Sequence, residues 1–280
     1  MFRNGWGEDV VVEEAESGSD EGVDTLDFSA VTSDITVLVK PDGSLLISDS
    51  NGNTVNAAHV ENLIGGSGTN SLDYSLYSSR VIVDLSSGEA TELYEVSGFT
   101  TVIGSPYEDT IRGDDQANIL RGGAGDDILS GNGGADMIFG GTGEDVIVET
   151  RNADFTLSDL ALVIASETDV LVSIESAVLT GGASANTIDA SAFTVGGVTL
   201  DGQAGGDILI GTAYDDLFTG GAGRDSFYGE GGTDTIVESR DADFVLTDTS
   251  LAIGVEAIDL LSSIEQADFT GGSFDADSTL

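Results

Sequence analysis

The chain has 280 residues, with 51 acidic against eight basic side chains, one histidine and no cysteine, and its formal net charge is −43. This charge repels phosphate backbones and anionic lipid headgroups, so we expect no nucleic-acid or membrane partner and regard cations as the natural ligands. Without cysteine and with His59 alone, disulfides, thiolate catalysis and zinc sites built on several histidines or cysteines are excluded. No apolar run approaches the 18 residues of a membrane-spanning helix.

The first segment, residues 1–103, is predicted to be β-rich and to contain degenerate repeats. Residues 65–73 read GGSGTNSLD, and β-branched stretches at 35–39 and 81–85 have the composition of strands. Residues 1–30 are acidic and lack an apolar core. We therefore expect export by a route other than a Sec-type signal peptide.

The second segment, residues 104–148, is an array of five nonapeptides. Its units read GSPYEDTIR, GDDQANILR, GGAGDDILS, GNGGADMIF and GGTGEDVIV. Their sixth positions are Asp109, Asn118, Asp127, Asp136 and Asp145. Each eighth position is a large apolar residue, so positions seven to nine predict a three-residue strand with its middle side chain buried.

Residues 149–201 form a β-rich intervening segment, and residues 202–237 form a second array of four units. These units read GQAGGDILI, GTAYDDLFT, GGAGRDSFY and GEGGTDTIV, with Asp207, Asp216, Asp225 and Asp234 at the sixth position. The last segment, 238–280, repeats 149–182. Arg151 and Arg240 occupy matching places in this longer repeat, where we expect them to form salt bridges with neighbouring acids.

Both ends of the chain contain partial units. Residues 5–11 fit positions two to eight of a unit, and residues 270–280 begin like residues 180–188. The sequence is therefore interpreted as a piece, or a relic, of a larger repeat protein.

The arrays resemble the RTX (hemolysin-type) family, whose repeat has the pattern G-G-x-G-x-D-x-U-x, where U is a large apolar residue. Residues 122–130, GGAGDDILS, match this pattern at every defined position. The resemblance implies an all-β fold, a parallel β-roll or β-helix solenoid, in which two units form one coil and calcium binds between turns of successive coils. It also implies type I secretion of an unfolded chain that calcium folds outside the cell.

The residue types of the repeat suit calcium. Glycines at positions one, two and four allow a tight turn whose carbonyl oxygens face a cation, and the sixth-position carboxylate completes the site. Oxygen ligands without His or Cys favour Ca²⁺ over zinc, and flexible coordination favours it over Mg²⁺. The predicted metal-site residues are Asp109, Asp127, Asp136, Asp145, Asp207, Asp216, Asp225, Asp234, Gly122, Gly123, Gly125, Gly140, Gly141, Gly143, Gly220, Gly221 and Gly223.

Pairing each unit with the second unit after it predicts five calcium ions. The pairs are Asp109 with Asp127, Asn118 with Asp136, Asp127 with Asp145, Asp207 with Asp225, and Asp216 with Asp234. Asn118 offers an amide where the family has a charge, and Tyr107 and Tyr214 replace the fourth-position glycine. We expect altered turns in those three units.

Three functions agree with these observations. The first is an extracellular, calcium-dependent structural module of an adhesin-like protein, with cell-surface or matrix components as partners and no catalytic residues. The second is the C-terminal calcium-folding module of a secreted enzyme or toxin, such as a protease, lipase or epimerase, whose catalytic domain lies elsewhere. The third is a glycan-active β-helix, which requires paired acids outside the sixth-position register. Because calcium repeats account for the positions of Asp and Gly, we predict the first.

Overall fold

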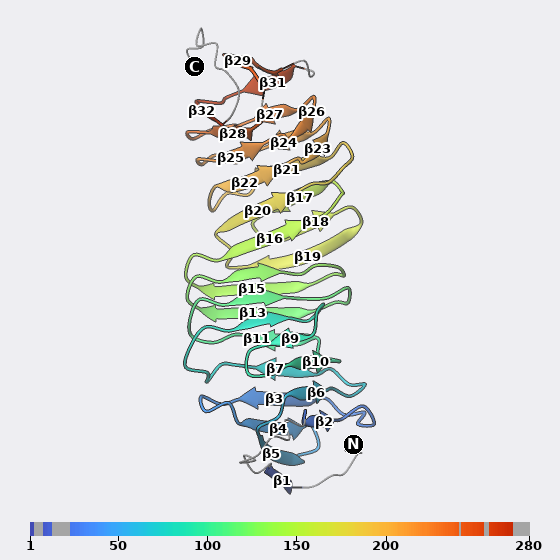
Figure 1. The fold of residues 1–280 in the computed structure, drawn as a ribbon. Helices are drawn as coiled ribbons and strands as arrows, with labels where there is room; N and C mark the ends of the chain where they lie inside the picture. Colours follow the sequence, from blue (N-terminus) through green and yellow to red (C-terminus); the bar gives the residue numbers. More distant parts are fainter. Residues whose placement is uncertain (3–7, 13–22, 241, 255–257, 271–280) are drawn as a thin grey trace. The chain divides into compact units, whose positions relative to one another are not determined.

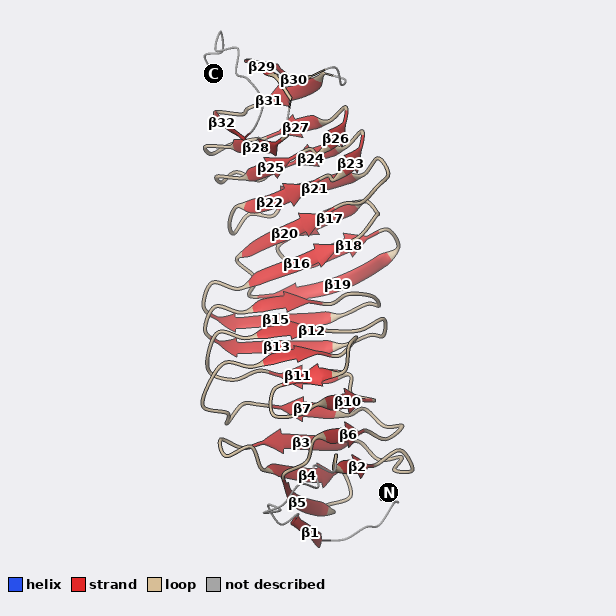
Figure 2. Cartoon of the chain, in the orientation of Figure 1, coloured by secondary structure: helices blue, strands red, loops and turns tan. Residues whose placement is uncertain are grey.

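A computed structural model describes residues 1–2, 8–12, 23–240, 242–254 and 258–270 (Figure 1). Within these residues all regular structure is β-strand (Figure 2). The chain divides into two compact units, Met1–Asp145 and Val146–Leu280. Of the partial units predicted at the chain ends, residues 5–7 and 271–280 lie outside the described residues.

The described residues of the first unit contain fifteen strands. They are β1 (Glu8–Val12), β2 (Thr25–Asp27), β3 (Ile35–Val39), β4 (Leu45–Asp49), β5 (Thr54–Ala58), β6 (Asn62–Ile64), β7 (Ser71–Asp73), β8 (Ile82–Asp84), β9 (Glu89–Ala90), β10 (Glu95–Ser97), β11 (Thr101–Ile103), β12 (Thr110–Arg112), β13 (Ile119–Ala124), β14 (Ile128–Ser130) and β15 (Met137–Thr142). The strands predicted at 35–39 and 81–85 are β3 and β8.

The second unit contains the remaining strands of the described chain. They are β16 (Val146–Thr150), β17 (Phe155–Ser158), β18 (Ala161–Ile164), β19 (Glu167–Val172), β20 (Ser176–Thr180), β21 (Thr187–Ala192), β22 (Val198–Asp201), β23 (Ala204–Gly205), β24 (Ile208–Ile210), β25 (Leu217–Thr219), β26 (Ala222–Gly223), β27 (Ser226–Tyr228), β28 (Thr235–Ser239), β29 (Phe244–Thr247), β30 (Ser250–Ile253), β31 (Asp259–Ser262) and β32 (Gln266–Thr270).

Within each array, strands pair in parallel with the strand 18 residues further along the chain. Leu120 of β13 pairs with Ile138 of β15, and Ile111 of β12 pairs with Leu129 of β14. In the second array β24 pairs with β27, and β25 with β28, at the same spacing. Two nonapeptides therefore form one coil, and the coils stack into two parallel sheets, as the all-β parallel roll predicted from the sequence requires.

The core of the roll is built from the eighth positions. Ile111, Leu120, Leu129, Ile138, Ile147, Leu209, Phe218, Phe227 and Ile236 are all fully buried. In the second array the rings of Phe218 and Phe227 contact edge to face, with centroids 6.0 Å apart. The period-two alternation of each short strand therefore directs one large apolar side chain per unit into the core.

Among the described residues, three excursions of three strands each interrupt the parallel stacking, and β8 and β9 form a shorter antiparallel hairpin. The three antiparallel excursions are β3–β4–β5, β17–β18–β19 and β29–β30–β31. Each ends at a non-glycine residue with positive φ, namely His59 (58°), Ser173 (54°) and Ser263 (53°). The next residue but one is a glutamate in every case: Glu61, Glu175 and Glu265. The long repeat recognised in the second half of the sequence thus has a third copy in the first unit.

Candidate metal centres

The sixth-position carboxylates are buried. Asp109, Asp127, Asp136, Asp145, Asp207, Asp216, Asp225 and Asp234 are each at most 3 % exposed. Taking an ionised carboxylate out of water is costly unless hydrogen bonds or an opposite charge compensate it. The partners of these eight carboxylates therefore define what the stacked turns can bind.

One carboxylate oxygen connects each turn to the turn one coil earlier. The main-chain nitrogen of the residue at position six donates a hydrogen bond to Oδ1 of the Asp 18 residues later. This contact measures 2.7 Å for Asp109 to Asp127, 2.8 Å for Asn118 to Asp136, 2.9 Å for Asp127 to Asp145, 2.9 Å for Asp207 to Asp225 and 3.0 Å for Asp216 to Asp234. The structure therefore brings together all five residue pairs named from the sequence.

The second carboxylate oxygen faces the next coil. Oδ2 of Asp127, Asp207, Asp225 and Asp234 is buried and has no hydrogen-bond partner. A Cβ placed on Gly122 would lie 2.1 Å from Oδ2 of Asp127 and 2.8 Å from the carbonyl oxygen of Gly140 in the next coil. Because Gly122 has no side chain, space remains beside the Asp127 carboxylate and the Gly140 carbonyl oxygen. Hard oxygen donors of this kind suit Ca²⁺.

The glycines at positions two and four have left-handed backbones. Their φ values are 124° for Gly123, 111° for Gly125, 128° for Gly141, 142° for Gly143, 79° for Gly221 and 140° for Gly223. A Cβ on Gly141 would lie 2.1 Å from the carbonyl oxygen of Gly123 one coil earlier. Glycine is needed here for its backbone conformation and for the close approach of successive turns. The remaining predicted glycines, Gly140 and Gly220, occupy first positions.

Three non-glycine residues at position two adopt the same left-handed backbone. Asn132, Gln203 and Glu230 have φ values of 59°, 70° and 67°. The turns at 131–136, 202–207 and 229–234 therefore share the shape of the glycine-rich turns although their sequences depart from the repeat pattern.

The electrostatics of the buried carboxylates favour a bound cation. Burial raises the pKa of Asp127, Asp225 and Asp234 to about 7, more than hydrogen bonds from the main chain lower it, and neighbouring carboxylates raise it further. Burial also raises the pKa of Asp109, Asp207 and Asp216. A calcium ion between the turns would supply the positive charge that these groups lack.

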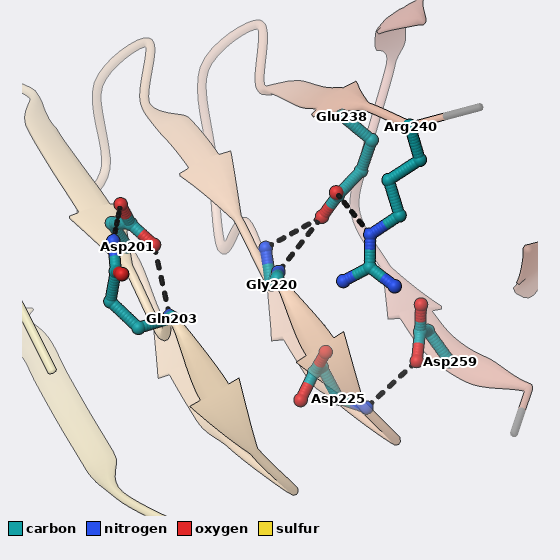
Figure 3. Close-up of polar contacts among 8 residues, drawn as sticks. Asp201, Gln203, Gly220, Asp225, Glu238, Arg240 and Asp259 are labelled. Carbon is teal, nitrogen blue, oxygen red and sulfur yellow. Dashed lines mark hydrogen bonds and ion pairs between the residues drawn. The ribbon is translucent and has the colours of Figure 1, made fainter. Parts of the chain in front are cut away.

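Other carboxylates continue the stack beyond the second array (Figure 3). Asp259 Oδ1 accepts a hydrogen bond from the Asp225 nitrogen at 2.8 Å, and Glu238 Oε1 accepts from the nitrogens of Gly220 and Gly221 at 2.9 and 3.0 Å. The sequence prediction missed Asp259 because it follows Asp225 by 34 residues rather than 18. It missed Glu238, which follows Gly220 by 18 residues, because this acid stands where the repeat pattern has a first-position glycine. The signal was present, since Leu261 is buried two places after Asp259, as at an eighth position.

The two arginines of the long repeat form ion pairs, as predicted. Arg151 Nη1 lies 3.0 Å from Glu167 Oε2, and Arg240 Nε lies 3.8 Å from Glu238 Oε2. In the second pair, Glu238 is also the acceptor for the main-chain nitrogens of Gly220 and Gly221. Arg240 therefore lies at the end of the second array (Figure 3).

Clusters of three or more His, Cys, Asp or Glu side chains suited to a metal ion are absent from the described part of the chain. A metal bound in the arrays would therefore take carboxylates in pairs, with main-chain oxygens as further ligands. The Asp127 carboxylate and the carbonyl oxygen of Gly140, which both lie near Gly122, are ligands of this kind from successive coils.

A family model described as the RTX calcium-binding nonapeptide repeat matches residues 96–129, 112–147 and 201–236. The two arrays are RTX calcium-binding repeats. The RTX match covers both runs of stacked turns, so the buried sixth-position Asp residues belong to calcium-binding repeats. A comparison with curated proteins finds no match. No helix long and apolar enough to cross a membrane occurs among the residues that the structure describes.

Proposed function

We propose that the chain is a calcium-dependent structural module of an extracellular, adhesin-like protein, and that it has no catalytic role. The observation that carries the proposal is the stack of buried carboxylates whose Oδ2 atoms, at Asp127 and Asp207, face the next coil without a donor. A calcium ion bound there would be held by these carboxylates and by main-chain oxygens such as that of Gly140. It would supply the charge that makes stacking of the coils favourable.

The size of the repeat supports a folding role for calcium. Each coil buries two large apolar side chains, whereas ordering its 18 residues costs about 1–2 kcal/mol per residue in backbone entropy. With a net charge of −43, the chain also repels itself. Calcium binding therefore contributes directly to folding, and the millimolar calcium outside cells suits it better than the cytosol.

The placement of the buried acids supports a structural role rather than catalysis. Oδ1 of Asp127 and Oδ1 of Asp225 each hold the main-chain nitrogen of the coil before. A group fixed in the backbone ladder in this way positions neighbouring turns. We further propose that cell-surface or matrix components are the partners of the assembled roll, and that the five Asp pairs are the candidate positions for calcium.

The test is a calcium titration of the full chain followed by far-ultraviolet circular dichroism, with magnesium as the control. We expect β-structure to increase with Ca²⁺ up to millimolar concentrations and to respond little to Mg²⁺, because Mg²⁺ requires a stricter octahedral geometry. A spectrum that is fully β without calcium and unchanged by it would overturn the proposal.

A further inference from the structure

The turns of this chain fall into two structural groups, which differ at positions two and four. In open turns both positions have positive φ; in closed turns neither has. The open turns are 122–127, 131–136, 140–145, 202–207, 220–225 and 229–234. The closed turns are 65–70, 104–109, 113–118, 181–186 and 211–216. Three of the closed turns are the array units in which the sequence predicts an altered turn.

In the closed turns of the arrays, the residue at position two donates hydrogen bonds to the side chain at position six. The Ser105 nitrogen donates to Asp109 Oδ2 at 2.5 Å, and its hydroxyl donates to Oδ1 at 2.8 Å. The Thr212 nitrogen donates to Asp216 Oδ2 at 2.6 Å, and its hydroxyl to Oδ1 at 3.1 Å. The two main-chain nitrogens thus satisfy Oδ2, the oxygen that remains unpartnered in Asp127 and Asp207.

The hydroxyl also fixes the shape of the closed turn. Ser105 Oγ accepts a hydrogen bond from the Tyr107 nitrogen at 3.2 Å, and Thr212 Oγ1 accepts from the Tyr214 nitrogen at 3.0 Å. Such side-chain to main-chain bonds stabilise a turn without positive φ. The fourth position can therefore hold a tyrosine, which would be strained in the left-handed conformation of an open turn.

Asparagine closes the other three turns. Asn118 Oδ1 accepts from the Asp114 nitrogen at 2.8 Å, and Asn186 Oδ1 accepts from the Gly182 nitrogen at 2.9 Å. Asn70 is fully buried, and its Nδ2 donates to the carbonyl oxygens of Gly66 at 2.8 Å and Gly98 at 2.6 Å. In this last turn an amide nitrogen binds the carbonyl oxygens that a cation would otherwise attract.

From these contacts we infer that calcium binds after open turns only, and that closed turns replace the ion with hydrogen bonds from the chain itself. Since Oδ2 faces the following coil, the first member of each Asp pair decides the outcome. The pairs that begin with Asp127 and Asp207 hold calcium. The pairs that begin with Asp109, Asn118 and Asp216 hold none. This inference rests on the proposed calcium function and reduces five candidate positions within the arrays to two.

The test is the number of calcium ions bound per full chain, measured by equilibrium dialysis at saturating calcium. Asp109→Asn and Asp216→Asn are expected to bind as many ions as the unchanged protein. Asp127→Asn and Asp207→Asn are each expected to bind at least one fewer. Loss of an ion in either closed-turn variant, or full binding in both open-turn variants, would overturn the inference.

The closed-turn variants keep the test informative if an open-turn variant does not fold. Asn118 already closes its turn as an amide, so Asn at position 109 or 216 preserves the acceptor for the position-two nitrogen. Folding of every variant is checked by circular dichroism in saturating calcium. If the unchanged protein binds no calcium, the proposed function itself fails, which is a different result from loss of an ion at Asp109 or Asp216.

A second measurement separates a turn-closing hydroxyl from a calcium ligand. Ser105→Ala is expected to lower the thermal midpoint and to leave the ion count unchanged, because the hydroxyl acts within the turn. Ser86→Ala is the matched control, since its hydroxyl donates to Asp84 Oδ1 at 2.6 Å in an exposed turn outside the arrays. A reduced ion count in Ser105→Ala, with an unchanged count in Ser86→Ala, would contradict the inference.

Discussion

The main-chain nitrogen of Asp234 donates a 3.0 Å hydrogen bond to the side chain of Glu265, 31 residues later. In the first unit the nitrogen of Asp24 makes the same contact with Glu61, at 2.9 Å. Both glutamates stand at the end of an antiparallel excursion, two residues after a positive-φ residue. A glutamate thus replaces the sixth-position Asp of a following coil where the regular repeat stops.

Removing this contact should destabilise the end of the second array. Glu265→Ala leaves the Asp234 nitrogen without its acceptor, and we expect a loss of about 1–3 kcal/mol in the free energy of unfolding. Glu265→Gln, which keeps an acceptor oxygen, should lose less. The measurement is denaturant unfolding in saturating calcium.

The control for this prediction is Asp248→Ala, which removes the same charge from an exposed position between β29 and β30. Its stability should stay within about 0.5 kcal/mol of the unchanged protein. If Glu265→Ala and Asp248→Ala lose equal stability, the Glu265 carboxylate does not cap the array.

Without calcium, the roll should be more stable in acid than at neutral pH. The pKa values of Asp127, Asp225 and Asp234 are raised to about 7 in the folded chain, against an ordinary value of 3.8. The folded state therefore holds more protons than the unfolded state between these values. The stability that protonation provides is fully present below about pH 4 and is lost as the pH rises towards 7.

The measurement is the thermal midpoint of calcium-free protein across this pH range. Asp127→Asn combined with Asp225→Asn should flatten the dependence, because an amide does not titrate. A pair of surface changes, Asp248→Asn with Asp115→Asn, lowers the general repulsion by the same charge at two exposed positions. If the surface pair flattens the pH dependence as much as the buried pair does, the pH dependence comes from general charge repulsion and not from burial of the sixth-position carboxylates.

The arrays could be predicted from the sequence because their spacing is regular. A period of nine places every eighth side chain in the core, and an offset of 18 stacks Asp127 on Asp145. The excursions were not predicted, since they insert a variable length between stacked residues. Asp225 reaches Asp259 after 34 residues and Asp234 reaches Glu265 after 31, so no fixed period connects them.

The state of each turn was only partly predictable. The sequence indicates an altered turn at Tyr107 and Tyr214. The deciding contacts, however, are made by the main-chain nitrogens of Ser105 and Thr212, and the positions of main-chain atoms cannot be inferred from the sequence. Gln203 illustrates the opposite difficulty. It departs from the glycine pattern and still adopts a φ of 70°.

Hydrogen exchange should separate calcium-dependent from calcium-independent turns. Amides of residues 62–73, where Asn70 closes the turn, should be protected with or without calcium. Amides of residues 122–145, which contain open turns, should gain protection when calcium is added, because unbalanced carboxylates favour local opening. The measurement is exchange followed by mass spectrometry of peptides from the full chain.

Within the same experiment, residues 202–210 provide an independent open turn in the second unit and should behave like 122–145. Calcium-induced protection of 62–73 equal to that of both open segments would show that the whole chain folds as one calcium-dependent step. The distinction between open and closed turns would then have no effect on folding.

The stacking of open turns predicts an unusually large effect at Gly223. Its φ is 140°, and a Cβ there would lie 1.4 Å from the carbonyl oxygen of Gly205 one coil earlier. Gly52 has a comparable left-handed backbone, with φ of 87°, but a Cβ there would meet no atom within 4 Å. Gly52→Ala should therefore cost only the conformational strain of about 1–2 kcal/mol.

Gly223→Ala carries that strain and also forces the two turns apart, since main-chain atoms on both sides of the contact cannot rotate away. We expect a loss above about 4 kcal/mol in calcium-saturated unfolding, together with fewer bound ions, because the turns of Asp207 and Asp225 would no longer stack. Equal losses for Gly223→Ala and Gly52→Ala would mean that strain alone determines the effect. The glycine at position four would then be required for φ and not for the close approach of successive coils.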